Sequence, residues 1–251
     1  MKIFPITIKR YRRFITKPFL KGWHAMGRIY SNNESLKDVA SRPNQPNERI
    51  IEYGFVFSAL RKVFPQSVLD VGPGLSSFPH LLLKCALDVT AVDNFSNYWG
   101  SSNYNRHFVL QDSKIEEYQS NKKFDFIYCV STLEHIPNSD DAISSMFKLL
   151  NPGGHLALTI PYNENTYHPN IYKHPEATFG KHVNYICQIF SREEITNWSK
   201  RNNATIIEQE YWQIYTGLMH TFGENMYPFI QTDQNSIHQL TCILFKKEYT
   251  V

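Results

Sequence analysis

The sequence lacks the long apolar segments of a membrane or secreted protein. No run approaches the ~18 consecutive apolar residues that span a bilayer as a helix. The N-terminus also lacks an apolar core of about 7–15 residues, the central part of a secretory signal peptide. The 42% of apolar residues are instead spread over 251 positions, enough for one sizeable core. These features predict a cytoplasmic protein with one main domain.

Cysteine and net charge are scarce as well. The four cysteines lie far apart and form no Cys-x-x-Cys pair, which argues against a disulfide framework and a zinc site: Cys85, Cys129, Cys187 and Cys242. Three histidines match no compact metal-ligand spacing, so no metal is expected: His168, His174 and His182. A formal net charge of +3 gives no global basic field, so nucleic acid is not the expected partner.

The N-terminal segment departs from this balance. Eight basic residues precede the first acidic residue, Glu34, and apolar and aromatic side chains are interleaved with them. Residues 41–47 are rich in turn formers. We interpret 1–47 as a basic arm and linker ahead of a main domain at 48–251. The arm either contacts an anionic surface such as a membrane or an acidic carrier, or covers the core with its charges in solvent.

Apolar segments alternate with segments of helical length through most of the main domain. Strands are expected at 67–71, 89–92, 107–110, 124–130, 155–160, 204–215 and 238–246. Helices are expected at 48–64, 77–85, 139–150 and from Ser191 onward. This alternation predicts an α/β fold with a doubly wound, mostly parallel, seven-stranded, Rossmann-like sheet. The last strand is expected to be antiparallel, because no crossover helix precedes it.

Two segments interrupt the alternation, at 161–190 and 216–236. The first holds three prolines and many aromatic residues but little periodicity. Segments of this length inside a compact domain are commonly functional, and the aromatic content argues against disorder. We interpret both as insertions that cover the strand ends and bind an acceptor.

The chain is organised around residues 68–77, with the sequence VLDVGPGLSS. An apolar strand ending in Asp70 and Val71 is followed by Gly72 and Gly74, and a helix is expected next. Glycines let a ligand approach the backbone closely, and the helix N-terminus offers free amide groups. The third glycine of a dinucleotide fingerprint is absent, because Ser77 stands there. This counts against a nicotinamide or flavin cofactor.

Acidic residues lie at the carboxyl ends of three successive strands: Asp70, Asp93 and Asp112. Asp93 lies about twenty residues past the glycine turn, where a carboxylate accepts hydrogen bonds from ribose hydroxyls. Asp112 ends the third strand, within reach of an adenine amino group. The three carboxylates and the glycine turn together indicate a nucleoside-containing cofactor.

At this point the chain resembles the class I S-adenosylmethionine-dependent methyltransferases, closely over 48–160 and more loosely over 191–247. The stretches that carry the resemblance are 68–74, Asp93, 111–113, 124–136 and 149–156. Ser76 departs from the family pattern, in which many members have a third glycine. The resemblance implies S-adenosylmethionine as cofactor and predicts the residues that bind it: Asp70, Gly72, Gly74, Asp93, Asn94, Asp112, Ser113, Ser131 and Leu133.

A looser resemblance, carried by 93–108 and 181–185, is to methyltransferases of bacterial surface-glycan and deoxysugar pathways. It implies O-methylation of a polar small molecule or glycan. A sugar hydroxyl needs a general base, and His135 and His182 are the candidates. The alternative for His135 is a structural role next to the following helix, and for His182 packing in the lid.

Other functions stay open at this point. The acceptor is alternatively a quinone-like carbon or an amine. The chain is alternatively a non-catalytic cofactor-binding subunit of a biosynthetic assembly, docked through its basic arm. Methylation of nucleic acid has only the basic arm in its favour. The acceptor, the methylated atom and the oligomeric state do not follow from the sequence.

Overall fold

The computed structural model describes residues 46–94 and 108–249. Almost all of the basic arm and residues 95–107 lie outside this part, so predictions about them stay predictions. The helices are α3 (Arg49–Val63), α4 (Phe78–Lys84), α6 (Ser139–Leu149) and α7 (Arg192–Arg201), with 3-10 turns η1 (Leu133–His135) and η2 (Ile171–Lys173). The strands are β1 (Ser67–Val71), β2 (Asp88–Asp93), β3 (Val109–Asp112), β4 (Phe124–Val130), β5 (Leu150–Pro161), β6 (Ala204–Tyr215), β7 (Asn225–Thr232) and β8 (Leu240–Lys247).

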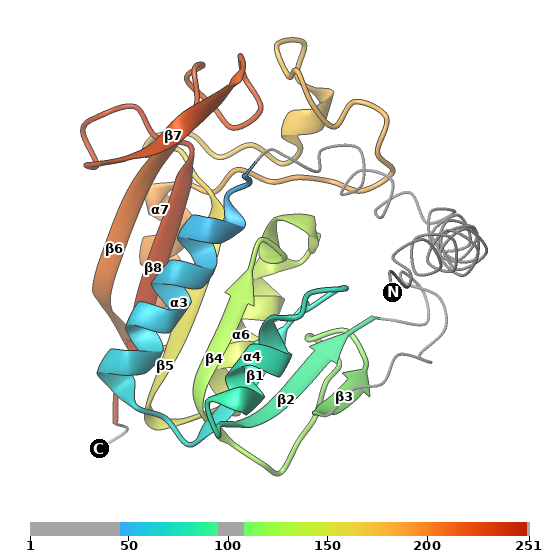
Figure 1. Cartoon of the computed structure of the whole chain (residues 1–251), viewed down its shortest axis with the longest axis vertical. Coiled ribbons are helices and arrows are strands. Elements are labelled where there is room, and N and C mark those ends of the chain that lie inside the picture. The colour runs from blue at the N-terminus through green and yellow to red at the C-terminus, as the bar shows by residue number, and fades with distance from the viewer. Residues whose placement is uncertain (1–45, 95–107, 250–251) are drawn as a thin grey trace, which may run out of the picture. The chain divides into compact units, whose positions relative to one another are not determined.

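The strands form one twisted sheet in the order β3-β2-β1-β4-β5-β8-β6-β7 (Figure 1). Strands β1 to β5 pair in parallel, whereas β8 is antiparallel to both β5 and β6. This confirms the predicted Rossmann-like sheet with its antiparallel last strand. The described sheet has eight strands, one more than expected, because β7 forms within the 216–236 segment and pairs antiparallel with β6.

Helices cover both faces of the sheet. Figure 1 shows α3 and α4 in front of the strands and α6 and α7 behind them. Each face has its own apolar cluster. Residues of α6 and α7 pack with one side of β1, β4 and β5, whereas residues of α3 and α4 pack with the other side. Because both faces are buried, the strands contain continuous apolar runs instead of a strict alternation.

The buried face of α3 differs from the expected one. In the sequence, five residues recur at helical spacing and predict the buried stripe: Ile50, Tyr53, Phe57, Leu60 and Phe64. Of these, Ile50 and Phe64 are 65% and 87% exposed. The buried stripe instead runs from Ile51 to Leu60 and includes Glu52, which is fully buried. The Glu52 carboxylate makes the inward stripe less apolar in the sequence, so Ile50 and Phe64 were wrongly expected on the buried face, whereas Leu60 is buried as expected.

Most element boundaries agree with the prediction to within a few residues. The capping box at the start of α7 is present, because Ser191 accepts from the amide of Glu193 and donates its own amide to Glu194. Strand β5 begins at Leu150, five residues earlier than expected. No helix in the part of the chain that the structure describes is long and apolar enough to cross a membrane.

Candidate functional site

The glycine turn after β1 packs directly on the loop that follows β4. Gly72 has φ +75°, and a Cβ there would lie 2.5 Å from Oγ1 and 2.8 Å from Cβ of Thr132. Thr132 also donates its hydroxyl to the Gly72 carbonyl at 3.1 Å. Only glycine fits this position without displacing the neighbouring loop. The turn and the end of β4 therefore form one unit.

The same turn contacts the ends of β2 and β3. The Gly74 amide donates to Oδ2 of Asp93 at 2.8 Å, and the Ser113 amide donates to the Asp93 carbonyl at 3.0 Å. Asp93 and Asp112 stand opposite each other in the parallel register. Asn94 is half-buried beside them. The structure thus brings five of the predicted cofactor-binding residues together at one sheet edge.

Asp70 lies deeper than its predicted role suggests. Its side chain is 3% exposed and accepts a hydrogen bond from the Tyr128 hydroxyl at 2.6 Å. Burial, reinforced by the nearby Asp93 carboxylate, raises the pKa of Asp70 to about 8. Asp70 therefore links β1 to β4 inside the fold, beneath the residues that face the sheet edge.

The departure from the family pattern at Ser76 has a structural use. Its Oγ lies 2.8 Å from the Tyr53 hydroxyl and accepts from the Phe78 amide at 3.0 Å. This second contact satisfies one of the free amides at the start of α4. The serine therefore fixes the glycine turn against both α3 and α4.

Ser131 adopts a left-handed backbone with φ +40° directly after β4. Its hydroxyl donates to the buried carboxylate of Glu52, which also accepts from the Thr159 hydroxyl at 2.7 Å and pairs with Arg49. Sequence reasoning missed Glu52, although a carboxylate in the first turns of an apolar helix was a signal. Leu133, another predicted cofactor residue, packs in the core and is fully buried.

His135 is held by the segment that follows β5. Its Nδ1 lies 2.7 Å from the Ile186 carbonyl, and its ring contacts Tyr185 edge-on at 4.8 Å. A carbonyl oxygen only accepts, so Nδ1 carries the proton and donates it. Burial lowers the pKa of His135, which keeps the ring neutral. In that tautomer Nε2 carries the lone pair, and the side chain of His135 is 33% exposed.

Glu134, next to His135, is 3% exposed. Its Oε2 has no hydrogen-bond partner in the described parts of the chain, and Oε1 lies 3.8 Å from Nε2 of His135. Burial, opposed by a backbone hydrogen bond and reinforced by Glu52, raises the pKa of Glu134 to about 8. A buried carboxyl of this kind is typical of ligand-binding sites.

The two predicted insertions pack on each other. We call residues 166–190 and 216–224 together the cap. Thr178 donates its amide and its hydroxyl to the Thr221 carbonyl at 2.8 and 2.6 Å. Phe222 joins Ile171 and Cys187 in a separate apolar cluster. The Gln188 amide then bonds the Glu134 carbonyl at 2.9 Å, which ties the cap to η1.

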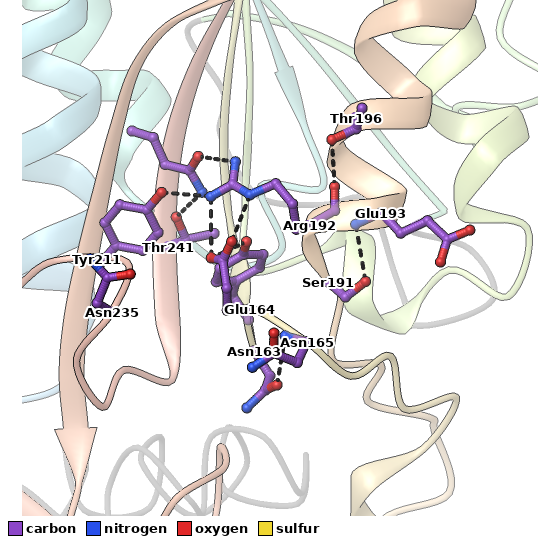
Figure 2. A network of polar contacts seen from close by, with 12 residues as sticks. Asn163, Glu164, Asn165, Ser191, Arg192, Glu193, Thr196, Tyr211, Asn235 and Thr241 are labelled. Atoms are coloured by element: carbon purple, nitrogen blue, oxygen red, sulfur yellow. Dashed lines mark hydrogen bonds and ion pairs between the residues drawn. The ribbon is translucent and has the colours of Figure 1, made fainter.

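A polar network anchors the base of the cap (Figure 2). Arg192, the first residue of α7, donates to Glu164 at 3.0 Å, to the Tyr211 hydroxyl at 2.6 Å and to Gln209 at 2.7 Å. Gln209 in turn bonds Thr241 of β8. The segment leaving β5 is thereby fixed to β6 and β8, so the cap starts from a rigid position.

His182, the second candidate base, occupies an exposed position in the cap. The structure does not bring it to His135, and its role stays a prediction. His168 and His174 contact each other through their rings. Within 46–94 and 108–249, no group of three or more histidine, cysteine or acidic side chains is arranged to hold a metal ion.

A model of the methyltransferase-domain family matches residues 28–209, more than half of the chain. The chain belongs to the class I methyltransferase family. Among solved structures, this family member resembles the N-methyltransferase NodS of Bradyrhizobium japonicum, solved with S-adenosylhomocysteine, with a TM-score of 0.53 and 16% identity over 82% of this chain and 90% of that one. It also resembles a 1,6-didemethyltoxoflavin N1-methyltransferase of Burkholderia thailandensis, with a TM-score of 0.54 and 14% identity. That match covers 99% of this chain and 93% of the other. These likenesses concern the fold.

Curated relatives of this methyltransferase-family chain differ in their acceptors. It is 22% identical to phosphoethanolamine N-methyltransferase 2 of Caenorhabditis elegans, over 68% of this chain and 42% of that protein. It is 28% identical to the ubiquinone biosynthesis O-methyltransferase of Coxiella burnetii, over 56% of this chain and 64% of that protein. The chain thus spans less than two thirds of the length of either relative.

Proposed function

We propose that this protein transfers a methyl group from S-adenosylmethionine to a hydroxyl group of a polar small molecule, with a sugar or glycan precursor as the expected acceptor. The cofactor would lie at the sheet edge where Gly72, Gly74, Asp93 and Asp112 meet. When bound, it supplies the activated methyl group, so the protein's part is to bind, orient and exclude water.

The neutral charge and the tautomer of the His135 ring are the observations that favour a hydroxyl acceptor. Its Nδ1 proton is committed to the Ile186 carbonyl, which leaves a neutral ring with its lone pair on Nε2. A hydroxyl must lose its proton as it becomes a nucleophile, and a neutral imidazole accepts that proton. Such a base contributes about 10²–10⁴-fold to the rate. His135 ends η1, which follows β4 and the loop that packs on Gly72.

An amine acceptor is the second candidate, favoured by one observation. The buried Glu134 oxygen without a described partner is a possible counter-ion for an ammonium group. However, the raised pKa of Glu134 keeps its carboxyl mostly protonated at neutral pH, which weakens that role. The phosphoethanolamine relative uses a nitrogen acceptor by its name, so both chemistries belong in the test.

The first experiment is calorimetric titration of the purified chain with S-adenosylhomocysteine, with NADH as the control ligand. We expect binding of the first compound and none of the second. Transfer of a labelled methyl group from S-adenosylmethionine is then measured with methyl α-D-glucopyranoside, catechol and ethanolamine. Transfer to a hydroxyl compound supports the proposal, whereas transfer to ethanolamine alone supports the amine candidate. Failure to bind S-adenosylhomocysteine contradicts both.

A further inference from the structure

Three polar side chains of η1 and the cap have buried atoms without a hydrogen-bond partner among the residues that the structure describes. They are Oε2 of Glu134, Nδ1 of His220 and Oγ1 of Thr221. Buried polar atoms in folded proteins are nearly always paired, with protein groups, water or a ligand. Glu134 belongs to η1, whereas His220 and Thr221 belong to the cap. Unpaired atoms on two separate segments indicate a polar ligand between these segments.

The backbone around His220 supports this reading. Thr221 has φ +69°, a left-handed conformation that a β-branched residue rarely adopts. The surrounding turn is fixed by hydrogen bonds from Thr216 to Glu224 and from Gly217 to Phe222, both at 3.0 Å. Strain that the neighbouring structure maintains in this way is commonly found at ligand-binding sites. The turn holds His220 and Thr221 in place.

His220 and Thr221 lie between Met219 and Phe222, which pack in the same apolar cluster as Tyr185, and the Tyr185 ring contacts that of His135. Burial and the nearby His135 together lower the pKa of His220 to about 4, against an opposing contribution from the Glu52 carboxylate. Two histidines from separate segments are therefore close enough to interact electrostatically. Both rings are neutral at physiological pH, so His220 offers one donor and one acceptor nitrogen, whereas His135 offers the acceptor Nε2 because its Nδ1 proton is bonded to Ile186.

The described charges around this cluster are already paired. Arg49 lies between the carboxylates of Glu48 and Glu52, and Glu48 is one-third exposed and screened by solvent. Glu134 is mostly protonated at neutral pH. A charged acceptor would therefore find no free counter-ion here among the described residues. An uncharged acceptor would lose no charge–charge interaction on binding.

We propose that Glu134 and His220 bind the acceptor, and that the acceptor is an uncharged molecule with a second hydroxyl group next to the one that is methylated. This inference rests on the proposed function and specifies its substrate class as a vicinal diol. Glu134 and His220 pair with the second hydroxyl, which places the first one at Nε2 of His135. Thr221 adds a further hydrogen-bonding atom on the cap side.

The test measures binding of two probes to the full chain loaded with S-adenosylhomocysteine. Saturation-transfer NMR compares methyl α-D-glucopyranoside, an uncharged polyol, with ethanolamine, a cation at neutral pH. We expect a signal for the polyol and a loss of about tenfold in its affinity on His220→Phe, which keeps the ring but removes both nitrogens. Glu134→Gln should retain more affinity than Glu134→Leu, because the amide still donates.

His155→Phe is the matched control. Nδ1 of His155 is also buried without a described partner, but this residue stands opposite Phe126 near the start of β4, at the far end of the sheet from η1. We expect unchanged polyol affinity in this variant and unchanged S-adenosylhomocysteine affinity in all of them. Because Nδ1, the buried nitrogen lost in His220→Phe, has no described partner, and Phe keeps an aromatic ring against Tyr215, this variant should unfold with about the same free energy as the wild type.

Each other outcome contradicts a defined claim. Equal polyol affinity in His220→Phe and the wild type removes His220 from the acceptor site. A preference for ethanolamine, or no polyol signal on the loaded wild-type protein, overturns the assigned substrate class. Loss of S-adenosylhomocysteine binding by the wild type would instead refute the proposed function. If His220→Phe fails to fold, His220→Asn repeats the comparison with a smaller change.

Discussion

Replacing Gly72 by alanine tests whether the glycine turn and the loop after β4 form one unit. A Cβ at Gly72 would lie 2.5 Å from Oγ1 and 2.8 Å from Cβ of Thr132. The positive φ of +75° adds a backbone penalty of about 1–2 kcal/mol for alanine. Relief of the clash requires overpacking shifts that cost about 1–3 kcal/mol more. We expect Gly72→Ala to lower the free energy of unfolding by about 2–5 kcal/mol.

The variant Gly153→Ala separates the backbone penalty from the cost of the clash. Gly153 has nearly the same φ, +76°, but its Cβ would approach the phenol end of Tyr249, which is 65% exposed and free to move. This control should therefore show only the backbone penalty of about 1–2 kcal/mol. Urea denaturation measures both variants. Titration with S-adenosylhomocysteine should show weaker binding for Gly72→Ala alone, since only that turn faces the cofactor edge.

A second substitution checks the contact itself. Thr132→Ala removes Oγ1 and Cγ2, and by itself loses one hydrogen bond worth about 0.5–1.5 kcal/mol. In the double variant Gly72→Ala/Thr132→Ala, most of the clash should disappear, so the two effects should not add. The reasoning is refuted if Gly72→Ala costs no more than Gly153→Ala, or if the double variant shows simple additivity.

Three further predictions concern the site. Asp93→Ala should weaken binding of S-adenosylhomocysteine by about 1–3 kcal/mol in calorimetry, because a charged hydrogen-bond partner is lost. His135→Asn should preserve that affinity but lower turnover by about 10²–10⁴-fold in the labelled-methyl assay. Glu134 binds a proton in the folded state up to pH about 8 but releases it near pH 4.5 when unfolded. Stability should therefore fall as the pH rises between these values, by up to about 1.4 kcal/mol per pH unit for this group, and Glu134→Gln should reduce that slope in urea denaturation.

Each of these predictions has a contrary result. Unchanged affinity in Asp93→Ala would remove this carboxylate from the cofactor site. Wild-type turnover in His135→Asn would reject it as the base. Measurements of the Glu134 slope belong between pH 6.5 and 8, above the unfolded-state pKa of this carboxyl and below its folded-state pKa. Asp70, with a pKa also near 8, contributes a parallel slope there, so only the difference between Glu134→Gln and the wild type is informative. An identical slope in both would show that Glu134 is ionised.

The cofactor half of the fold was accessible from the sequence because its signals are local. Strands β1 and β6 begin and end at the predicted residues, and the capping box at Ser191 lies within four positions. The glycine turn and Asp93 are separated by one helix and one strand, so their meeting follows from the right-handed crossover of parallel strands. The Gly74–Asp93 hydrogen bond confirms that they meet.

The acceptor half was much less accessible because long-range packing forms it. His220 is a single histidine in a segment without periodicity, and its position depends on contacts with Thr178 in the other insertion. Strand β7 was missed because it is largely exposed and contains Pro228, which is unusual inside a strand. Glu52 was overlooked since its partners lie far along the chain, Ser131 directly after β4 and Thr159 in β5.

The order of these parts along the chain has a consequence for engineering. The residues predicted to bind the cofactor lie between Asp70 and Leu133, whereas His220 and the rest of the cap come later. Arg192 ties the base of the cap to β6 and β8. One contiguous cassette, from the end of β5 to the start of β8, thus carries both cap segments together with the strand that supports them. Exchanging this cassette between relatives would move His220 and the rest of the cap as one piece, whereas Glu134 and His135 would stay with the cofactor-binding part of the chain.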